Sequence, residues 1–389
     1  MPAAPAYAFS LGDLLGQTVD SSSPDYQSSS SGSSLINILI GLVSGKFLGS
    51  AFDSNYNNSS ASPLKPNAAG EKEVVGFYAE WWGADTSSFN SMVKNADAVS
   101  TIAPFWTTLN GDASLTDRGG NDHTAVAKKA HDNNIPVLLL VNNEKQNEVT
   151  PPIHTVLENP NLRTKAINNL EAYIKKYKLD GVNIDFEMVP AGDRENLTSF
   201  MRELSARLRP QGYVVSIDVF PKQDESNDVS IAYDYQELAK YADKIMIMTY
   251  DNHGAWSQAG AIADINWVEN NLKYALRFIP KEKIYLGIAA YGYDWSSKGV
   301  ESLEYPAIMN LVQKFGSSVL WDESSKSPHF SYTGPDGIAH NVWFENSESL
   351  KYKLDLVNKY DIAGIAIWKL GEEDPGYWKV IKDKLSLRR

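Results

Sequence analysis

From Glu73 onward, short apolar runs alternate with longer polar stretches of helical character. The eight apolar runs are VVGFYAE (74–80), AVSTIAPFW (98–106), IPVLLLVN (135–142), GVNIDFE (181–187), VVSIDVF (214–220), KIMIMTY (244–250), KIYLGIAAY (283–291) and GIAIWKL (364–370). Nearly continuous apolar strands separated by helices are typical of a parallel sheet whose faces are both covered. An open doubly wound sheet would show the same alternation, but no glycine-rich phosphate loop follows an early run. The pattern therefore predicts an α/β fold, a (β/α)8 TIM barrel.

The connection between the seventh and eighth runs is much longer than the others. It includes YPAIMNLVQKFG, SPHFSYTGPDG and AHNVWFE, in which a Gly-Pro-Asp-Gly turn separates two aromatic-rich runs. Such a turn between strand-like runs indicates a hairpin. We expect a small α+β insertion at about 296–345, beside the C-terminal mouth of the barrel, where it could wall a substrate groove.

Residues 1–72 differ in composition from the predicted barrel at 73–389. The stretches 21–34 and 55–70 are rich in Ser and Asn, and such segments bury too little apolar surface to offset chain entropy. Between them lies the apolar segment 35–52, which Lys46 interrupts and which is shorter than the roughly 20 apolar residues of a membrane span. We therefore predict a flexible arm whose apolar segment is a short docking helix or, alternatively, a membrane or assembly anchor.

Composition excludes several classes of protein. The net charge is −12, which argues against a nucleic-acid surface, because such surfaces need clustered cations. The absence of cysteine excludes disulfides, thiolate zinc sites and cysteine nucleophiles. The six histidines show no metal-ligand spacing, so we expect neither a metal nor a cofactor. The N-terminus lacks the basic region of a secretory signal.

The segment DGVNIDFE carries the most informative chemistry. Alternation along a strand gives two opposite faces, namely Val182, Ile184 and Phe186 on one and Asn183, Asp185 and Glu187 on the other. The polar face must look into the barrel and ends at the C-terminal rim, where barrel active sites form. Two acids on one strand face raise the proton affinity of one of them. We expect Glu187, at the rim, to be protonated near neutral pH and Asp185 to balance charge, whereas a structural ion-pair network would require a basic residue that this strand lacks.

The same segment resembles the DxxDxDxE signature of glycoside hydrolase family 18, the chitinase-like barrels. MTYD at 248–251, LGIAAYGYDW at 286–295 and GIAIWKLG at 364–371 are similar to family segments on the sixth, seventh and eighth strands. FYAEWW on the first strand is compatible with the family. The resemblance spans about residues 73–386 and implies a glycosidase for polymers that contain N-acetylglucosamine.

Position by position, the resemblance implies a catalytic role for each matching residue. Glu187 would protonate the glycosidic oxygen while the substrate's own N-acetyl carbonyl attacks the anomeric carbon, so that configuration is retained. Asp185 would hold the acetamido nitrogen, and Tyr250 would hydrogen-bond the acetamido oxygen. Asp251 would contact the distorted sugar, and Trp368 would stack beneath it.

One signature position differs, because Asn183 stands where the family has its second aspartate. We expect Asn183 to contribute to the substrate site and to share a hydrogen bond with Asp185, with altered pH dependence rather than lost activity. Asn at this position resembles the spore-cortex-lytic N-acetylglucosaminidase branch, which implies peptidoglycan before chitin as substrate. It also implies an extracellular, cell-wall or spore-associated location.

Further residues beyond strand ends are candidates for substrate contact. Trp82 and Trp106 could stack on sugar units or pack internally, and Tyr291 follows the seventh strand, where it could line the site. Asp218 alternates with Ser216 on the fifth strand, which favours a buried hydrogen-bond partner over a catalyst.

The leading hypothesis is an active glycosidase whose partner is a polysaccharide. The alternatives are a carbohydrate-binding, lectin-like barrel without catalysis and a structural protein of a spore or surface layer. Lectin-like relatives usually lack the glutamate, which is present here as Glu187.

Overall fold

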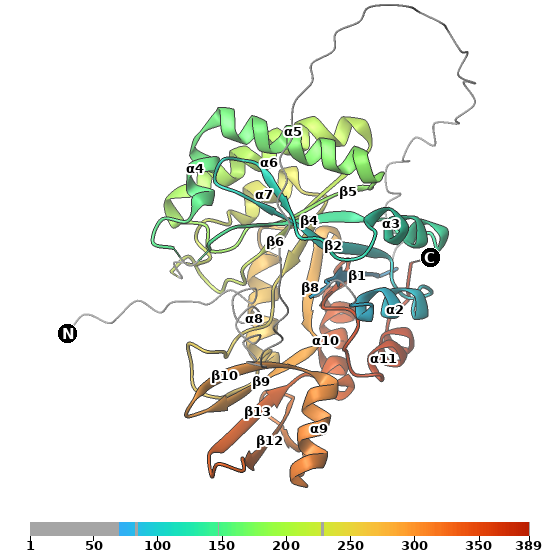
Figure 1. Ribbon diagram of the computed structural model, residues 1–389, viewed down its shortest axis with the longest axis vertical. Coiled ribbons are helices and arrows are strands. Elements are labelled where there is room, and N and C mark those ends of the chain that lie inside the picture. The colour runs from blue at the N-terminus through green and yellow to red at the C-terminus, as the bar shows by residue number, and fades with distance from the viewer. Residues whose placement is uncertain (1–69, 82–84, 147, 227–228, 389) are drawn as a thin grey trace, which may run out of the picture.

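The computed structural model describes residues 70–388 except 82–84, 147 and 227–228 (Figure 1). The predicted N-terminal arm, apart from 70–72, and its apolar segment 35–52 therefore lie outside the described residues. Within the described part of the chain, no helix has the length and apolar character needed to cross a bilayer.

Eight parallel strands of the described chain close into a barrel, which confirms the predicted fold. They are β1 (Glu73–Tyr78), β2 (Thr101–Leu109), β4 (Leu138–Asn143), β5 (Gly181–Asp185), β6 (Val214–Val219), β7 (Lys244–Ile247), β8 (Ile284–Ala289) and β14 (Gly364–Trp368). The order β1-β14-β8-β7-β6-β5-β4-β2 closes because β1 pairs with both β14 and β2. A short strand, β3 (Leu115–Asp117), pairs antiparallel with β2.

Helices cover the outside of the barrel, as Figure 1 shows. They are α2 (Ser87–Lys94), α3 (His123–Asp132), α4 (Pro152–Glu158), α5 (Pro160–Tyr177), α6 (Arg194–Leu208), α7 (Tyr235–Tyr241), α8 (Ile265–Ala275), α10 (Ser347–Tyr360) and α11 (Tyr377–Lys384). The outward residues of β5, Val182 and Ile184, are fully buried in the core between strands and helices. This burial on both faces is the physical reason for the apolar runs in the sequence.

Charged residues fill the N-terminal end of the barrel. Lys244 on β7 forms a buried ion pair with Glu73 on β1, and its Nζ donates to the Tyr285 hydroxyl at 2.8 Å. The Tyr285 hydroxyl in turn donates to Glu73 Oε2 at 2.7 Å. Arg388, near the C-terminus, also pairs with Glu73. This network occupies the barrel interior at the end opposite to the predicted active site.

The insertion forms a second, antiparallel sheet that lies below the barrel in Figure 1. Its strands are β9 (Tyr291–Ser296), β10 (Gly299–Glu304), β11 (Leu320–Asp322), β12 (Ser327–Thr333) and β13 (Ala339–Phe344), accompanied by helix α9 (Tyr305–Phe315). The Gly-Pro-Asp-Gly turn joins β12 to β13, as predicted. The sheet begins at Tyr291, earlier than the predicted boundary at 296, because β9 follows β8 after a single intervening residue.

Candidate active site

A cavity of about 460 Å³ lies at the C-terminal ends of the barrel strands. Its lining includes Asn142, Asp185, Asp218 and Trp368, which stand near the ends of β4, β5, β6 and β14. Glu187 and Tyr250 line the same cavity. The structure therefore brings together the acid, the second carboxylate and the tyrosine that the sequence singled out.

The backbone of Glu187 is held by the side chain of Asn143 at the end of β4. The Glu187 N–H donates to Asn143 Oδ1 at 2.8 Å, and Asn143 Nδ2 donates to the Glu187 carbonyl oxygen at 3.0 Å. The Tyr233 hydroxyl donates to the carbonyl oxygen of Phe186 at 2.6 Å. Asn143 was not a candidate from the sequence, although it directly follows Asn142 at the end of the third apolar run. These contacts fix the position from which the Glu187 carboxyl extends.

Asp185 and Asp218 are both buried carboxyls. Burial raises the pKa of Asp185 to about 7. Burial also raises the pKa of Asp218, and the charges of Asp185 and Glu187 raise it further, while a hydrogen bond from Asn183 opposes the shift. The two groups therefore titrate far above the ordinary range of aspartate.

Asn183 is fully buried below the cavity and does not line it. Its Nδ2 donates to Asp218 Oδ2 at 2.5 Å, and its Oδ1 accepts from the Ser216 hydroxyl at 2.7 Å. The expected hydrogen bond with Asp185 and the expected place in the substrate site are thus wrong. The register of β5 and β6 pairs Asn183 with Ser216, so the amide lies against the neighbouring strand. The prediction that Asp218 is a buried hydrogen-bond partner is confirmed.

Asp251 follows Tyr250 in a left-handed backbone conformation, with φ of 58°, and lines the cavity. Its Oδ1 accepts hydrogen bonds from the hydroxyls of Tyr291 at 2.5 Å and Tyr293 at 2.8 Å. Burial raises the pKa of Asp251 to about 6, although these hydrogen bonds lower it. Tyr291, which the sequence suggested could line the site, is not among the residues that line this cavity; its hydroxyl holds Asp251.

Trp368 forms the aromatic floor of the cavity together with rings from β1 and β2. Its ring centroid lies 5.5 Å from that of Phe77 and 6.3 Å from that of Phe105. Trp81 lies 6.4 Å away on the same side of the barrel. These contacts fix the half-buried indole, which a sugar ring could cover.

Trp106 and Trp82 are the two tryptophans that the sequence suggested for stacking on sugar units. Trp106 is only 1 % exposed and stacks on His123 at 4.0 Å between barrel and helices, so of its two expected roles the structure favours internal packing over a sugar contact. Because strand side chains alternate, the inward position belongs to Phe105, which lines the cavity. Trp82 lies outside the described residues.

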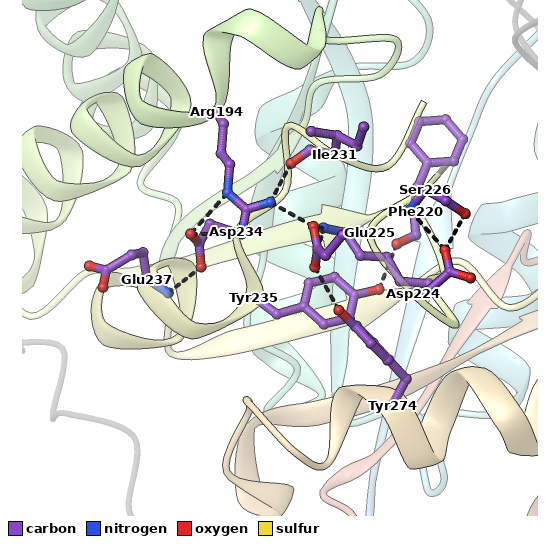
Figure 2. Close-up of polar contacts among 11 residues, drawn as sticks. Arg194, Phe220, Asp224, Glu225, Ser226, Ile231, Asp234, Tyr235, Glu237 and Tyr274 are labelled. Carbon is purple, nitrogen blue, oxygen red and sulfur yellow. Dashed lines mark hydrogen bonds and ion pairs between the residues drawn. The ribbon is translucent and has the colours of Figure 1, made fainter. Parts of the chain in front are cut away.

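The loop between β6 and α7 supplies one wall of the cavity, through Lys222, Gln223, Asp224 and Ser226. Figure 2 shows the ionic network that holds this loop around Glu225. Glu225 accepts hydrogen bonds from Arg194 at 2.7 Å, the Tyr274 hydroxyl at 2.6 Å and Lys222 at 3.1 Å. Burial would raise the pKa of Glu225, but these three donors hold it at about 2. No sequence pattern predicts this network, because its members come from three separate segments of the chain, namely α6, the loop itself and α8.

No group of three or more His, Cys, Asp or Glu side chains arranged to hold a metal ion occurs among the described residues.

Comparisons with known proteins agree with this geometry. The sequence model of glycosyl hydrolases family 18 matches residues 73–373. The uncharacterized glycosylase YvbX of Bacillus subtilis (strain 168) is 30 % identical over 318 residues, covering 80 % of this chain and 92 % of that protein. The cortical fragment-lytic enzyme of Bacillus anthracis is 30 % identical over 311 residues, covering 75 % and 71 % respectively.

Solved structures show the same architecture. The spore cortex-lytic enzyme SleL of Bacillus cereus has a TM-score of 0.75 at 25 % identity, covering 82 % of this chain and 76 % of that one. A chitinase from Chromobacterium violaceum ATCC 12472 has a TM-score of 0.74 at 27 % identity, covering 82 % and 100 %. With the family match over most of the barrel and the acidic cavity at its C-terminal end, this chain belongs to glycosyl hydrolases family 18 and is a glycoside hydrolase.

Proposed function

We propose that this chain is a retaining glycosidase that hydrolyses β-1,4-linked glycans containing N-acetylglucosamine. The observation that carries the proposal is the convergence of Glu187, Asp185 and Tyr250 on one cavity whose floor is Trp368. A carboxyl donor, a second buried carboxyl, a phenol and an aromatic platform are the groups that substrate-assisted cleavage of an N-acetylated sugar requires.

In the proposed reaction, Glu187 gives its proton to the glycosidic oxygen as the bond from that oxygen to the anomeric carbon breaks. The N-acetyl carbonyl oxygen of the same sugar forms a bond to the anomeric carbon from the opposite face, which leaves a positive charge on the acetamido group. Asp185 in its ionised form stabilises this charge, and Tyr250 hydrogen-bonds the acetamido oxygen. Water then attacks the anomeric carbon as its bond to the acetamido oxygen breaks, and Glu187 takes a proton from this water, so two inversions give net retention.

We propose peptidoglycan as the preferred substrate, with chitin oligosaccharides as a second class. Support comes from the relatives, since one is a cortical fragment-lytic enzyme and another is a spore cortex-lytic enzyme. Di-N-acetylchitobiases of mammals, such as that of Rattus norvegicus at 28 % identity, support activity on chitin-type oligosaccharides. We also propose a place at the cell wall or spore, which the same relatives support.

The test is incubation with N-acetyl-chito-oligosaccharides and with purified peptidoglycan, followed by mass spectrometry of the products. We expect products that carry N-acetylglucosamine at the reducing end. NMR of the newly formed ends should show that the β configuration is retained. Glu187→Gln keeps the size of the side chain but cannot donate a proton, so kcat should fall by several orders of magnitude while binding persists. Sugar binding without cleavage by the unaltered protein would indicate the lectin-like alternative, and near-normal turnover by Glu187→Gln would overturn the assignment of the acid.

A further inference from the structure

Asp218 is an acid of the cavity to which the proposed reaction gives no role. It lies on β6, is 2 % exposed and lines the same cavity as Asp185 and Glu187. Its Oδ2 accepts the short hydrogen bond from Asn183, whereas its Oδ1 is buried and has no hydrogen-bond partner among the described residues. One carboxyl oxygen is therefore held in place and the other is available to carry a proton.

The strand register sets Asp218 beside Asp185. The registered pairs of β5 and β6 run from Gly181 and Val214 to Ile184 and Ile217. One further step of this register sets Asp185 beside Asp218, and the charge of Asp185 raises the pKa of Asp218. Side chains at equivalent positions of neighbouring strands point to the same face, which here is the barrel interior. Two adjacent buried carboxyls cannot both ionise at moderate cost, and the stable form near neutral pH holds one proton between them.

The groups around Asp218 do not compensate a second negative charge. From the end of β5, Glu187 is a third carboxyl, which raises the pKa of Asp218 when it is ionised, and Tyr250 beyond β7 is a phenol whose pKa burial raises. Across β7, the residue paired with Asp218 is Met246. Lys222 lies further along the Asp218 segment, but its Nζ is bound to Glu225 at 3.1 Å.

We propose, on the basis of the function proposed above, that Asp218 is the proton-holding partner of Asp185. When positive charge develops on the substrate's acetamido group, the proton of the pair moves from Asp185 to Oδ1 of Asp218. The electron pair of the broken O–H bond stays on Asp185, which becomes the stabilising anion, and the pair keeps one proton and one negative charge throughout. Because Asp218 acts through Asp185, it is a positioning residue rather than a catalytic one.

This arrangement explains why an amide stands at position 183. A third carboxylate there would lie against Asp218 and would add charge to a layer that already holds two acids. The uncharged Asn183 instead donates to Asp218 and accepts from Ser216, so it orients the acid without adding charge. The acid that the family signature has on β5 stands here on the neighbouring strand.

The test is the pH dependence of kcat and KM for the full chain with the substrate that it cleaves. Asp218→Asn preserves size and an oxygen that can accept from Asn183, but it cannot take the proton. Asp185 must then lose its proton to solvent, which burial of its carboxyl opposes. Relative to the wild type, the kcat/KM of Asp218→Asn should fall at least tenfold more at pH 5 than at pH 8. Its KM should stay within threefold of the wild-type value. The matched control Ser216→Ala removes the other hydrogen bond to Asn183 and should keep the shape of the wild-type profile.

A double variant adds a rescue arm. Asn183→Asp combined with Asp218→Asn returns an acid to the signature position. The loss of kcat/KM at low pH, which is the acid limb of its pH profile, should then move back toward that of the wild type. An Asp218→Asn enzyme with the wild-type profile would overturn the inference, and so would a Ser216→Ala enzyme with an equally shifted limb.

A readout without substrate separates this inference from the proposed function. Carbon-13 NMR of labelled aspartate carboxyls should show the pair losing its two protons in separate steps, the second of which disappears in Asp218→Asn. A pair that is already doubly ionised at pH 7 would overturn the inference. Two clear steps in a protein that cleaves neither substrate would refute only the proposed function.

Discussion

The Asn143 side chain offers a direct test of how the acid is positioned. Asn143→Ala removes two hydrogen bonds, of 2.8 and 3.0 Å, to the backbone of Glu187. At about 0.5–1.5 kcal/mol each, their loss should lower the free energy of unfolding by about 1–3 kcal/mol. A typical domain has about 5–15 kcal/mol of stability, so the variant should remain folded. A displacement of the acid by about 1 Å would reduce kcat by about 10²-fold.

The assay combines urea unfolding with steady-state kinetics on the cleaved oligosaccharide. Asn143→Asp serves as the matched variant, because its carboxylate still accepts from the Glu187 N–H but cannot donate to the carbonyl oxygen. Its kcat should lie between those of the wild type and the alanine variant. A stability loss of the expected size with kcat within threefold of the wild type would show that Asn143 supports the fold but does not position the acid.

Three further predictions concern the cavity wall, the barrel floor and the chain boundary. The folded pKa of Glu225, about 2, lies below that of an exposed glutamate, so its ion pairs stabilise the fold at neutral pH and stop doing so as the pH falls toward 2. The difference in melting temperature between the wild type and Glu225→Gln should therefore shrink from pH 7 to pH 3; a constant difference would contradict this. Lys244→Ala should cost about 1–3 kcal/mol by urea unfolding, because it removes one of the two cations that pair with the buried Glu73 carboxylate and leaves Arg388 as the other; an unchanged free energy of unfolding would refute it. A chain that begins at Gly70 should keep the full kcat, whereas one that begins at Glu73 should melt lower, because it lacks the ion pair of Lys72 at 2.6 Å; equal melting temperatures would contradict this.

The strand pattern of the sequence was sufficient to predict the barrel and the inward direction of Asp185 and Glu187. Both results depend on alternation within one strand, which is a local property. Trp106 shows the limit of this reasoning. The run at 98–106 is apolar on both faces, so its composition does not reveal that Phe105, rather than Trp106, points inward.

Side-chain contacts between neighbouring strands could not be predicted from the sequence. The partner of Asn183 depends on the register of β5 against β6, which the hydrogen bonds of the whole barrel set together. The Glu225 network depends on how the loop folds over α6 and α8, from which Arg194 and Tyr274 reach it. Residues far apart in the chain come into contact only through tertiary packing, and the periodicity of the sequence does not predict such contacts.

The insertion contacts the candidate active site directly. Strand β9 leaves the barrel directly after β8. The hydroxyls of its two tyrosines, Tyr291 and Tyr293, donate hydrogen bonds to Asp251. An exchange of this module between related enzymes would therefore succeed only if the joint were placed beyond Tyr293. A graft made at the edge of the barrel would carry the donor's tyrosines into the host site, so the choice of crossover point would alter catalysis as well as the shape of the groove.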